Sequence, residues 1–312
     1  MIVKQALIVG TPVALSDYKS GASIRLNTVK RILMQSGFEI KLVSSSEYSK
    51  MPEFTWDVIV IVSFAATQSL KKARKESRFL WLDATDSWHQ TRISRIKAGE
   101  IAQIAALLRD IYRLSRVRKI DLVTFISQFD ASRESKYTRK RGGEVLVFPN
   151  HFDQNTLGAK GENRLVFVGD GDYPPNRSAI KFLEKIRKLL PTHQDIHLVG
   201  RNLATKSKGF VFLSRVSDDE LYGVGDIHLA PVFSGSGIKN KVAEPLFYGL
   251  TVITTRHGSN GLMPSKRLLV RKTPKEFAEA IQLALASSFP TELDSNFQFD
   301  ESAKLLKILG QR

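Results

Sequence analysis

The stretch DIHLAPVFSGSGIKNKVAEPLFYGLTVITT, residues 226–255, decides the fold class of this chain. Residues 226–230 form an apolar run that predicts a strand, and residues 241–248 have the spacing of a helix. A second apolar run at 251–255 predicts another strand. A helix between two strands makes them parallel members of a sheet covered on both faces. This is the β/α/β unit of doubly wound proteins.

The turn between the first strand and the helix has the composition of an anion-binding site. Gly235 and Gly237 let backbone amides approach an oxyanion, and the helix start adds N–H groups without partners. Lys239 and Lys241 add positive charge. Glu244 would be repelled by a phosphate unless it accepts hydrogen bonds from neutral hydroxyls, such as those of a ribose. The alternative is that the turn only ends a strand and that Glu244 is an acid favoured by the helix dipole.

The same alternation extends in both directions along the chain, and it predicts an α/β protein with two doubly wound, Rossmann-like halves that face a cleft. The predicted strands are 5–10, 39–43, 56–62, 78–82, 122–126, 145–148, 165–169, 196–200, 226–230 and 251–255. The predicted helices are 24–35, 178–190, 218–222, 241–248 and 274–286.

The chain has 312 residues, enough for two domains of ordinary size. A stretch rich in Gly, Asn and Lys separates the two series of strands and helices. We predict an N-terminal acceptor-side domain at 1–158 and a C-terminal nucleotide-sugar-binding domain at 159–290. Residues 291–312 are predicted to form a tail or helix that crosses back to the first domain.

Composition excludes several other classes of site. The chain has no cysteine, and its six histidines have no ligand-like spacing, so we expect no disulfide and no metal site. No apolar run is long enough to span a membrane, and we expect a cytoplasmic protein. The net charge is +16, and residues 70–141 hold 18 Lys and Arg against 8 Asp and Glu. This excess indicates a polyanionic partner or a phosphate-bearing substrate.

The run at 226–255 resembles the donor-binding segment of the family-four retaining glycosyltransferases, whose usual form is P…G.G…K..EA.A.G.PVV.T. Further matches follow in the order that the family expects, and they include a PPN sequence that is typical of a subgroup. In the first half, SGASIR at 20–25 and LDATDS at 82–87 resemble two loops of the family. The other matching segments are VFPNHFD (147–153), FVGDGDYPPN (167–176), HLVGR (197–201), RVSDDELY (215–222) and GSNGL (258–262).

The resemblance implies the GT-B architecture and transfer of a hexosyl or deoxyhexosyl group from a UDP- or GDP-sugar, with retention and without a metal cofactor. It places the amides near Gly21 by the donor phosphates, Lys241 on the diphosphate and Glu244 on the ribose. The amides of the turn would face the sugar-phosphate. The predicted donor-binding residues are Gly21, Arg201, Gly235, Ser236, Gly237, Lys239, Lys241 and Glu244.

The sequence departs from the family pattern at three positions. Ser236 stands where a second Glu is usual, Asp170 stands where an Arg often follows Val-Gly, and Thr85 stands where many members place a His. Asp86 is a candidate for contacting the acceptor hydroxyl, with a helix cap or turn residue as the alternative. His89 is a candidate acid-base, with a surface loop residue as the alternative. No protein nucleophile is expected.

A basic amphipathic helix is predicted at residues 100–119, with one apolar face and arginines beside it. With Lys71 and Lys72, its Arg109, Arg113 and Arg116 predict a cationic surface on the acceptor-side half. An anionic membrane is the first partner that this surface indicates, because family members modify lipid-linked or surface glycans at the inner leaflet. The acceptor is then a glycan or a lipid-linked molecule, and the protein is peripheral to the inner face of the membrane.

Two other functions fit the same residues. A DNA-modifying glycosyltransferase that acts on a hydroxymethylated base would use the cationic surface to bind DNA phosphates. A non-catalytic protein that binds sugar nucleotides or polyanions would explain the three departures from the family pattern. The sequence does not indicate an oligomeric state.

Overall fold

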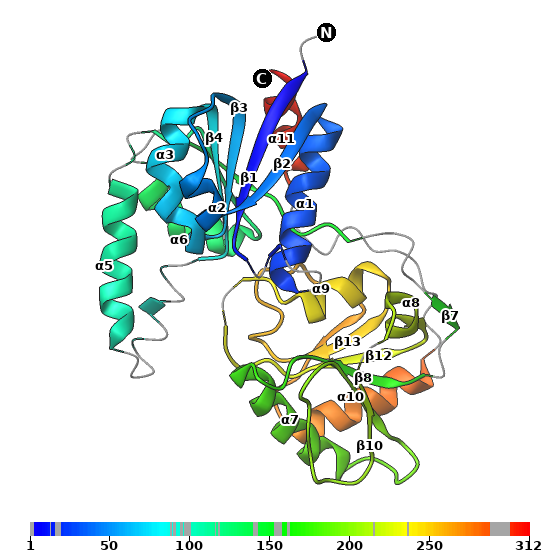
Figure 1. The fold of residues 1–312 in the computed structure, drawn as a ribbon. Coiled ribbons are helices and arrows are strands. Elements are labelled where there is room, and N and C mark those ends of the chain that lie inside the picture. The colour runs from blue at the N-terminus through cyan, green and yellow to red at the C-terminus, as the bar shows by residue number, and fades with distance from the viewer. Residues whose placement is uncertain are drawn as a thin grey trace. The chain divides into compact units, whose positions relative to one another are not determined.

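The computed structural model divides into two compact units, which are residues Met1–His151 with Phe299–Arg312, and residues Phe152–Gln298. Each unit is an α/β body with its own parallel sheet (Figure 1). The structure describes residues 3–12, 14–15, 20–87, 89, 92–93, 96, 101–115, 117, 119–139, 143–152, 158–160, 163–214, 216–235, 237–287 and 300–312.

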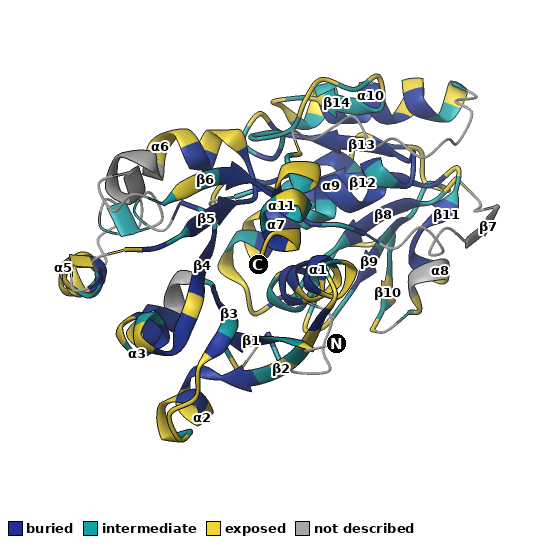
Figure 2. Ribbon diagram, turned by 90° about the horizontal axis from the view of Figure 1, so that it is seen from above, coloured by how far each residue is buried: buried dark blue, intermediate teal, exposed yellow. Residues whose placement is uncertain are grey.

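The first unit contains a six-stranded sheet in the order β2-β1-β3-β4-β5-β6, with every neighbouring pair parallel. The central strands are buried along nearly their whole length, because both of their faces are covered (Figure 2), and most of their buried residues are apolar. The strands are β1 (Lys4–Gly10), β2 (Phe38–Ser44), β3 (Trp56–Val62), β4 (Ser77–Thr85), β5 (Leu122–Phe125) and β6 (Glu144–Val147).

Two helices cover one face of this sheet and the remaining ones cover the other, with a hydrophobic core on each side. On the first face, α11 packs beside α1 and adds Leu305 and Leu309 to the core. That face carries α1 (Gly21–Gln35) and α11 (Ser302–Gly310); the other carries α2 (Ser45–Lys50), the 3-10 helix η1 (Phe64–Ser69), α3 (Leu70–Glu76), α5 (Ala102–Ser115) and α6 (Gln128–Arg139).

The second unit contains a six-stranded parallel sheet in the order β10-β9-β8-β12-β13-β14. Helices α7 and α10 share a core on one face, and α9 packs on β12 and β13. A short pair of strands, β7 (Gly158–Lys160) and β11 (Gly223–Val224), lies apart from the sheet. The sheet strands are β8 (Leu165–Val168), β9 (Ile196–Val199), β10 (Phe210–Leu213), β12 (Ile227–Ala230), β13 (Thr251–Thr254) and β14 (Leu268–Val270); the helices are α7 (Pro174–Arg187), α8 (Asp218–Leu221), α9 (Asn240–Phe247) and α10 (Pro274–Ala286).

The strand order fixes where each sheet can bind a ligand. In doubly wound sheets, ligands bind beyond the carboxyl ends of the strands, at the point where the strand order reverses. In the second unit this point lies between β8 and β12, and in the first it lies between β1 and β3. Functional residues are therefore expected in the loops that follow these four strands.

The structure contains each predicted strand and helix, but it corrects the starts of two helices. Helix α7 begins at Pro174 and not at residue 178, because two prolines occupy its first positions, where proline is favoured. Helix α1 begins at Gly21 and not at residue 24, because Ser20 caps it: the Ser20 hydroxyl accepts from the Ser23 amide, and the Ser23 hydroxyl accepts from the Ser20 amide. Gly21 is thus the first helical residue and not part of a loop. Within the described part of the chain, no helix is both long and apolar enough to cross a membrane.

Candidate functional site

The Gly-rich turn of the second unit leaves β12 at the reversal point of its sheet. Gly235 and Gly237 have φ values of 106° and 69°, in the left-handed region that a side chain disfavours. The ammonium of Lys239 donates to the carbonyl oxygen of Gly237 at 2.5 Å and to that of Gly235 at 3.3 Å. Lys239 is therefore held on its own loop. The predicted contact at Ser236 lies outside the described residues.

Lys241 and Asn176 connect the first turns of α9 and α7, the helices that follow β12 and β8. The Lys241 ammonium donates to the Asn176 side-chain oxygen at 2.5 Å and lies 4.7 Å from the centroid of the Phe167 ring. Asn176 in turn donates to the Asp170 carbonyl oxygen at 2.8 Å. Burial lowers the pKa of Lys241 to about 8, because a charged amine loses hydration there. The Asn176 amide and the Phe167 ring are both uncharged, so these two contacts do not neutralise the Lys241 ammonium.

The PPN sequence places Asn176 where it can make these bonds. Pro174 and Pro175 are the first two residues of α7, where proline suits the helical φ and no N–H is needed. Asn176 follows in the first turn and is 5% exposed. Glu244 is also buried at 5%, three residues after Lys241 and so on the same side of α9. A carboxylate and an ammonium thus share one side of this helix.

The loops after β8 and β9 are tied together by polar contacts. Arg201 donates to the Asp170 carboxylate at 2.6 Å, and Asn202 donates to the Asp172 carboxylate at 2.6 Å. The Asp172 backbone N–H and the Arg201 guanidinium hold the pKa of Asp170 below its ordinary value. Asp170 stands where the family resemblance expects an arginine, and Arg201 of the neighbouring loop places a guanidinium there instead.

In the first unit, α1 points its N-terminus toward the same edge of the sheet as the carboxyl end of β1. The Ser20 cap satisfies the Ser23 amide. Among the described residues, none accepts a hydrogen bond from the Gly21 amide, which leaves this end of the helix able to bind an anion.

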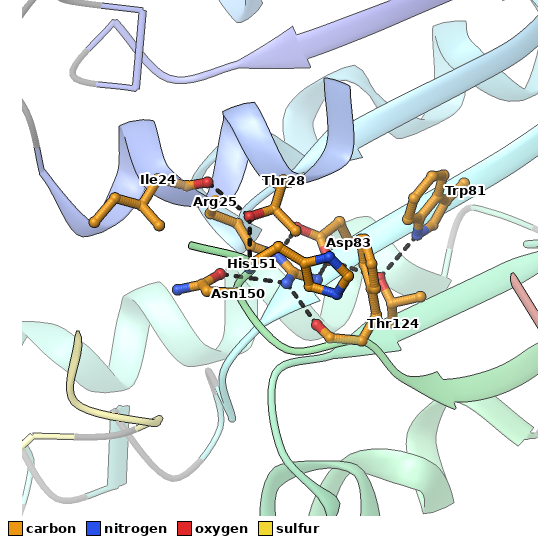
Figure 3. A network of polar contacts seen from close by, with 9 residues as sticks. Ile24, Arg25, Thr28, Trp81, Asp83, Thr124, Asn150 and His151 are labelled. Carbon is orange, nitrogen blue, oxygen red and sulfur yellow. Dashed lines mark hydrogen bonds and ion pairs between the residues drawn. The ribbon is translucent and has the colours of Figure 1, made fainter. Parts of the chain in front are cut away.

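A buried ion pair fixes α1 against the sheet (Figure 3). Arg25 and Asp83 are 1% and 0% exposed, and the guanidinium donates to both carboxylate oxygens, one of them at 2.7 Å. Thr124 donates to Asp83 at 2.6 Å and accepts from the Trp81 indole at 2.8 Å. Arg25 also donates to the Phe148 carbonyl oxygen at 2.5 Å.

This network connects α1, β4, β5 and the end of β6 at one place in the core. Arg25 lies about one turn after Gly21, and Asp83 lies two residues before the end of β4. The ion pair therefore sets the position of the α1 N-terminus relative to the loop that carries Asp86.

The loop after β4 begins with strained backbone. Thr85 has a φ of 66°, and Ser63, which follows the neighbouring strand β3, has a φ of 75°. The Thr85 hydroxyl is buried and has no hydrogen-bond partner among the described residues. Asp86 is half-buried, and His89 is half-buried in a helical turn, where burial lowers its pKa. Non-glycine residues in this conformation cluster at functional sites.

The predicted cationic surface is only partly available. Lys71 and Arg109 are exposed. Lys72 is not a free surface charge, because it pairs with the buried Glu76 at 2.7 Å and lies over the Tyr48 ring. Arg113 is half-buried and 3.9 Å from Asp110. Arg116 lies outside the described residues.

The structure brings most of the predicted donor residues together within the second unit. The loop and helix after β12 carry Gly235, Gly237, Lys239, Lys241 and Glu244. Arg201 joins the neighbouring loop through Asp170, whereas Gly21, Asp86 and His89 belong to the first unit. Sequence reasoning gave no role to Asn176, Arg25 and Asp83. Only Asn176 had a local signal, its place in the PPN sequence.

The fold is that of solved GT-B glycosyltransferases. Over 91% of this chain and 90% of the other, it matches the apo form of the lipopolysaccharide outer core galactosyltransferase WaaB, with a TM-score of 0.57 and 12% identity. The glycotransferase of kitacinnamycin gives a TM-score of 0.50 and 12% identity over 91% of both chains. The UDP-GlcNAc 2-epimerase from Methanocaldococcus jannaschii gives 0.51 and 11% identity over 99% of this chain and 100% of the other. The class predicted from the sequence, two Rossmann-like α/β units, is confirmed.

The match to a protein family lies in the second unit. Residues 162–287 match the family model of glycosyl transferases group 1, and they include the Gly-rich turn, Lys241 and Glu244. The resemblance seen in the sequence is therefore confirmed for this part of the chain. Membership of the PPN subgroup remains a prediction. Among curated proteins, none matches the sequence.

Proposed function

We propose that this glycosyltransferase moves a hexosyl or deoxyhexosyl group from a UDP- or GDP-sugar to a glycan or lipid-linked acceptor, with retention and without a metal ion. The observation that carries the donor part is the Lys241 ammonium at the reversal point of the second sheet. Burial beside a neutral amide leaves this cation favourably placed for an anion. The buried Glu244, on the same side of α9, provides the acceptor for ribose hydroxyls.

The chemistry that these residues support is stabilisation of the leaving group. During transfer, the bond from the anomeric carbon to the diphosphate breaks, a bond to the acceptor oxygen forms, and the proton of the acceptor hydroxyl passes to the departing diphosphate. Negative charge grows on the departing diphosphate, and a preorganised ammonium with helix N-termini stabilises it without reorganisation. In this proposal Lys241 and the amides of the Gly-rich turn take that role. Asp86 contacts the acceptor hydroxyl.

Glu244→Gln is expected to weaken nucleotide binding by roughly tenfold to a hundredfold, because hydrogen bonds to a carboxylate contribute about 1.5–3 kcal/mol. A thermal-shift screen of UDP, GDP, ADP and dTDP with their sugars first identifies the donor, since a ligand of the folded state alone raises Tm. The measurement is then the Kd of the ribonucleotide and of its 2′-deoxy form. The native protein prefers the ribonucleotide, and Glu244→Gln loses that preference.

Glu279→Gln is the matched control for this prediction. Glu279 lies on α10 of the same unit and is 64% exposed, so its substitution leaves both affinities unchanged. An undiminished preference for ribose in Glu244→Gln would contradict the assignment of Glu244.

Diphosphate affinity is expected to fall as the pH rises above about 8, the pKa of Lys241. Below that pH the amine is protonated and attracts the diphosphate; above it the free protein holds a neutral amine. The affinity for the diphosphate then drops by up to about tenfold per pH unit, until the pH reaches the pKa of the ligand-bound amine. Calorimetric titration with the nucleoside diphosphate between about pH 7.5 and pH 9 tests this, where the ligand's own charge changes least.

Lys241→Arg separates this effect from general alkaline changes. A guanidinium keeps its proton throughout the range, so the affinity of this variant does not depend on pH. If native protein and Lys241→Arg lose affinity in parallel, another group is titrating and the role of Lys241 is refuted.

A further inference from the structure

Helix α5 of the first unit presents its large apolar side chains to solvent. Ile101, which directly precedes the helix, is 75% exposed, Leu108 is 61% exposed and Tyr112 is 58% exposed. Ile104 and Ile111 are exposed as well. At 100° per residue these five side chains fall within an arc of about 100°. We call Ile101, Ile104, Leu108, Ile111 and Tyr112 the apolar face of α5.

The opposite side of α5, which packs on the protein, is less apolar than the exposed side. Its buried residues are Ala106, Asp110 and Leu114, with Asp110 at 2% exposure. Arg92 donates to the Asp110 carboxylate through two nitrogens, at 3.1 and 3.2 Å. Turning the helix to bury its isoleucines would break this ion pair. The outward direction of the apolar face is therefore built into the packing.

This arrangement reverses the usual pattern of a surface helix. Helices of globular proteins direct their apolar stripe toward the core, and contiguous exposed apolar patches mark sites where something else binds. The identity of the partner follows from the charges around the patch.

The surroundings of the apolar face are cationic. Arg109 is exposed on α5 beside the face, and Lys71 and Lys75 are exposed on α3, which packs against α5. A second copy of the chain would bring these like charges together, which opposes self-association through this face. Nucleic acid would engage the cations through phosphates but would leave the isoleucines and Leu108 without a partner. An anionic lipid surface satisfies both kinds of side chain.

We propose that the apolar face of α5 inserts into the interface of an anionic bilayer while Arg109 and the lysines of α3 remain at the headgroups. This surface belongs to the first unit, whereas Lys241 and Glu244 belong to the second, so the proposal does not rest on glycosyl transfer.

Flotation of the full-length protein with phosphatidylcholine vesicles, with and without phosphatidylglycerol, tests the proposal. The native protein floats with the anionic vesicles. The double variant Ile104→Gln/Leu108→Gln is expected to bind them about tenfold more weakly or worse, because the transfer of two apolar side chains is lost. Arg109→Glu weakens binding roughly fivefold for each charge removed, and this loss disappears in high salt.

Leu283→Gln is the matched control, since Leu283 on α10 is 58% exposed, close to Leu108, but belongs to the second unit. It leaves vesicle binding unchanged. The Tm of each variant and its shift with nucleotide verify that the donor domain is intact, so a failure here is distinguishable from a failure of the proposed function.

Three results would overturn the proposal. One is no binding of the native protein to anionic vesicles. Another is full binding by Ile104→Gln/Leu108→Gln, which would show that charge alone adsorbs the protein. The third is a double variant that changes only the oligomeric mass measured by light scattering, which would identify the apolar face as a contact between copies of the chain.

Discussion

Arg25→Met is expected to lower the free energy of unfolding of the first unit by about 3–5 kcal/mol, because it leaves the Asp83 carboxylate buried without its cation. The Phe148 carbonyl oxygen loses a donor in the same step. All three tryptophans, at positions 56, 81 and 88, belong to the first unit, and Trp81 is part of the network itself. Tryptophan fluorescence in a urea titration therefore reports on this unit alone.

Arg78→Met is the control with identical chemistry. Arg78 pairs with Asp57 at 3.2 Å in the same unit but is 75% exposed, so its loss costs about 0–1 kcal/mol. Equal losses in the two variants would show that the buried pair contributes no more than a surface pair. The double variant Arg25→Met/Asp83→Leu recovers much of the stability, because it removes the unpaired charge as well.

Lys241→Met is expected to lower kcat/KM for the donor by about a hundredfold to a thousandfold, the usual loss when one preorganised electrostatic contact to a developing charge is removed. The measurement is release of the nucleoside diphosphate in the presence of acceptor. Most of the loss is expected in kcat, because the diphosphate carries more charge in the transition state than in the bound donor.

Lys239→Met provides the comparison within the same turn. Its ammonium is held by two carbonyl groups of its own loop, so its removal is expected to cost less than the removal of Lys241. If the order of the two effects is reversed, Lys239 and not Lys241 is the residue that serves the leaving group.

The fold could be predicted from sequence wherever a strand is buried on both faces. Such strands are continuous apolar runs, and β1, β3 and β12 were predicted within one residue of their bounds. The strands β10 and β14 were missed because they lie at the edges of their sheet, where half-exposed residues replace the apolar run. The start of α1 was missed because its capping box uses two serines in place of the usual Ser and Glu.

The site was predictable only where its residues are close in sequence. The turn from Gly235 to Glu244 carries its own signal in glycines, lysines and a following helix. The pair Arg25 and Asp83 is 58 residues apart and has no such signal. The periodicity of α5 showed an apolar stripe, but it could not show that the Arg92–Asp110 pair turns that stripe away from the core.

The contact between Lys241 and Asn176 constrains how this enzyme can diverge. The two positions are 65 residues apart, yet each restricts which side chain the other position can accommodate. An aspartate at 176 would form an ion pair with the Lys241 ammonium and neutralise it. A larger side chain at 176 would push the first turns of α7 and α9 apart. Lineages that descend from this chain should therefore exchange these two residues together or keep both.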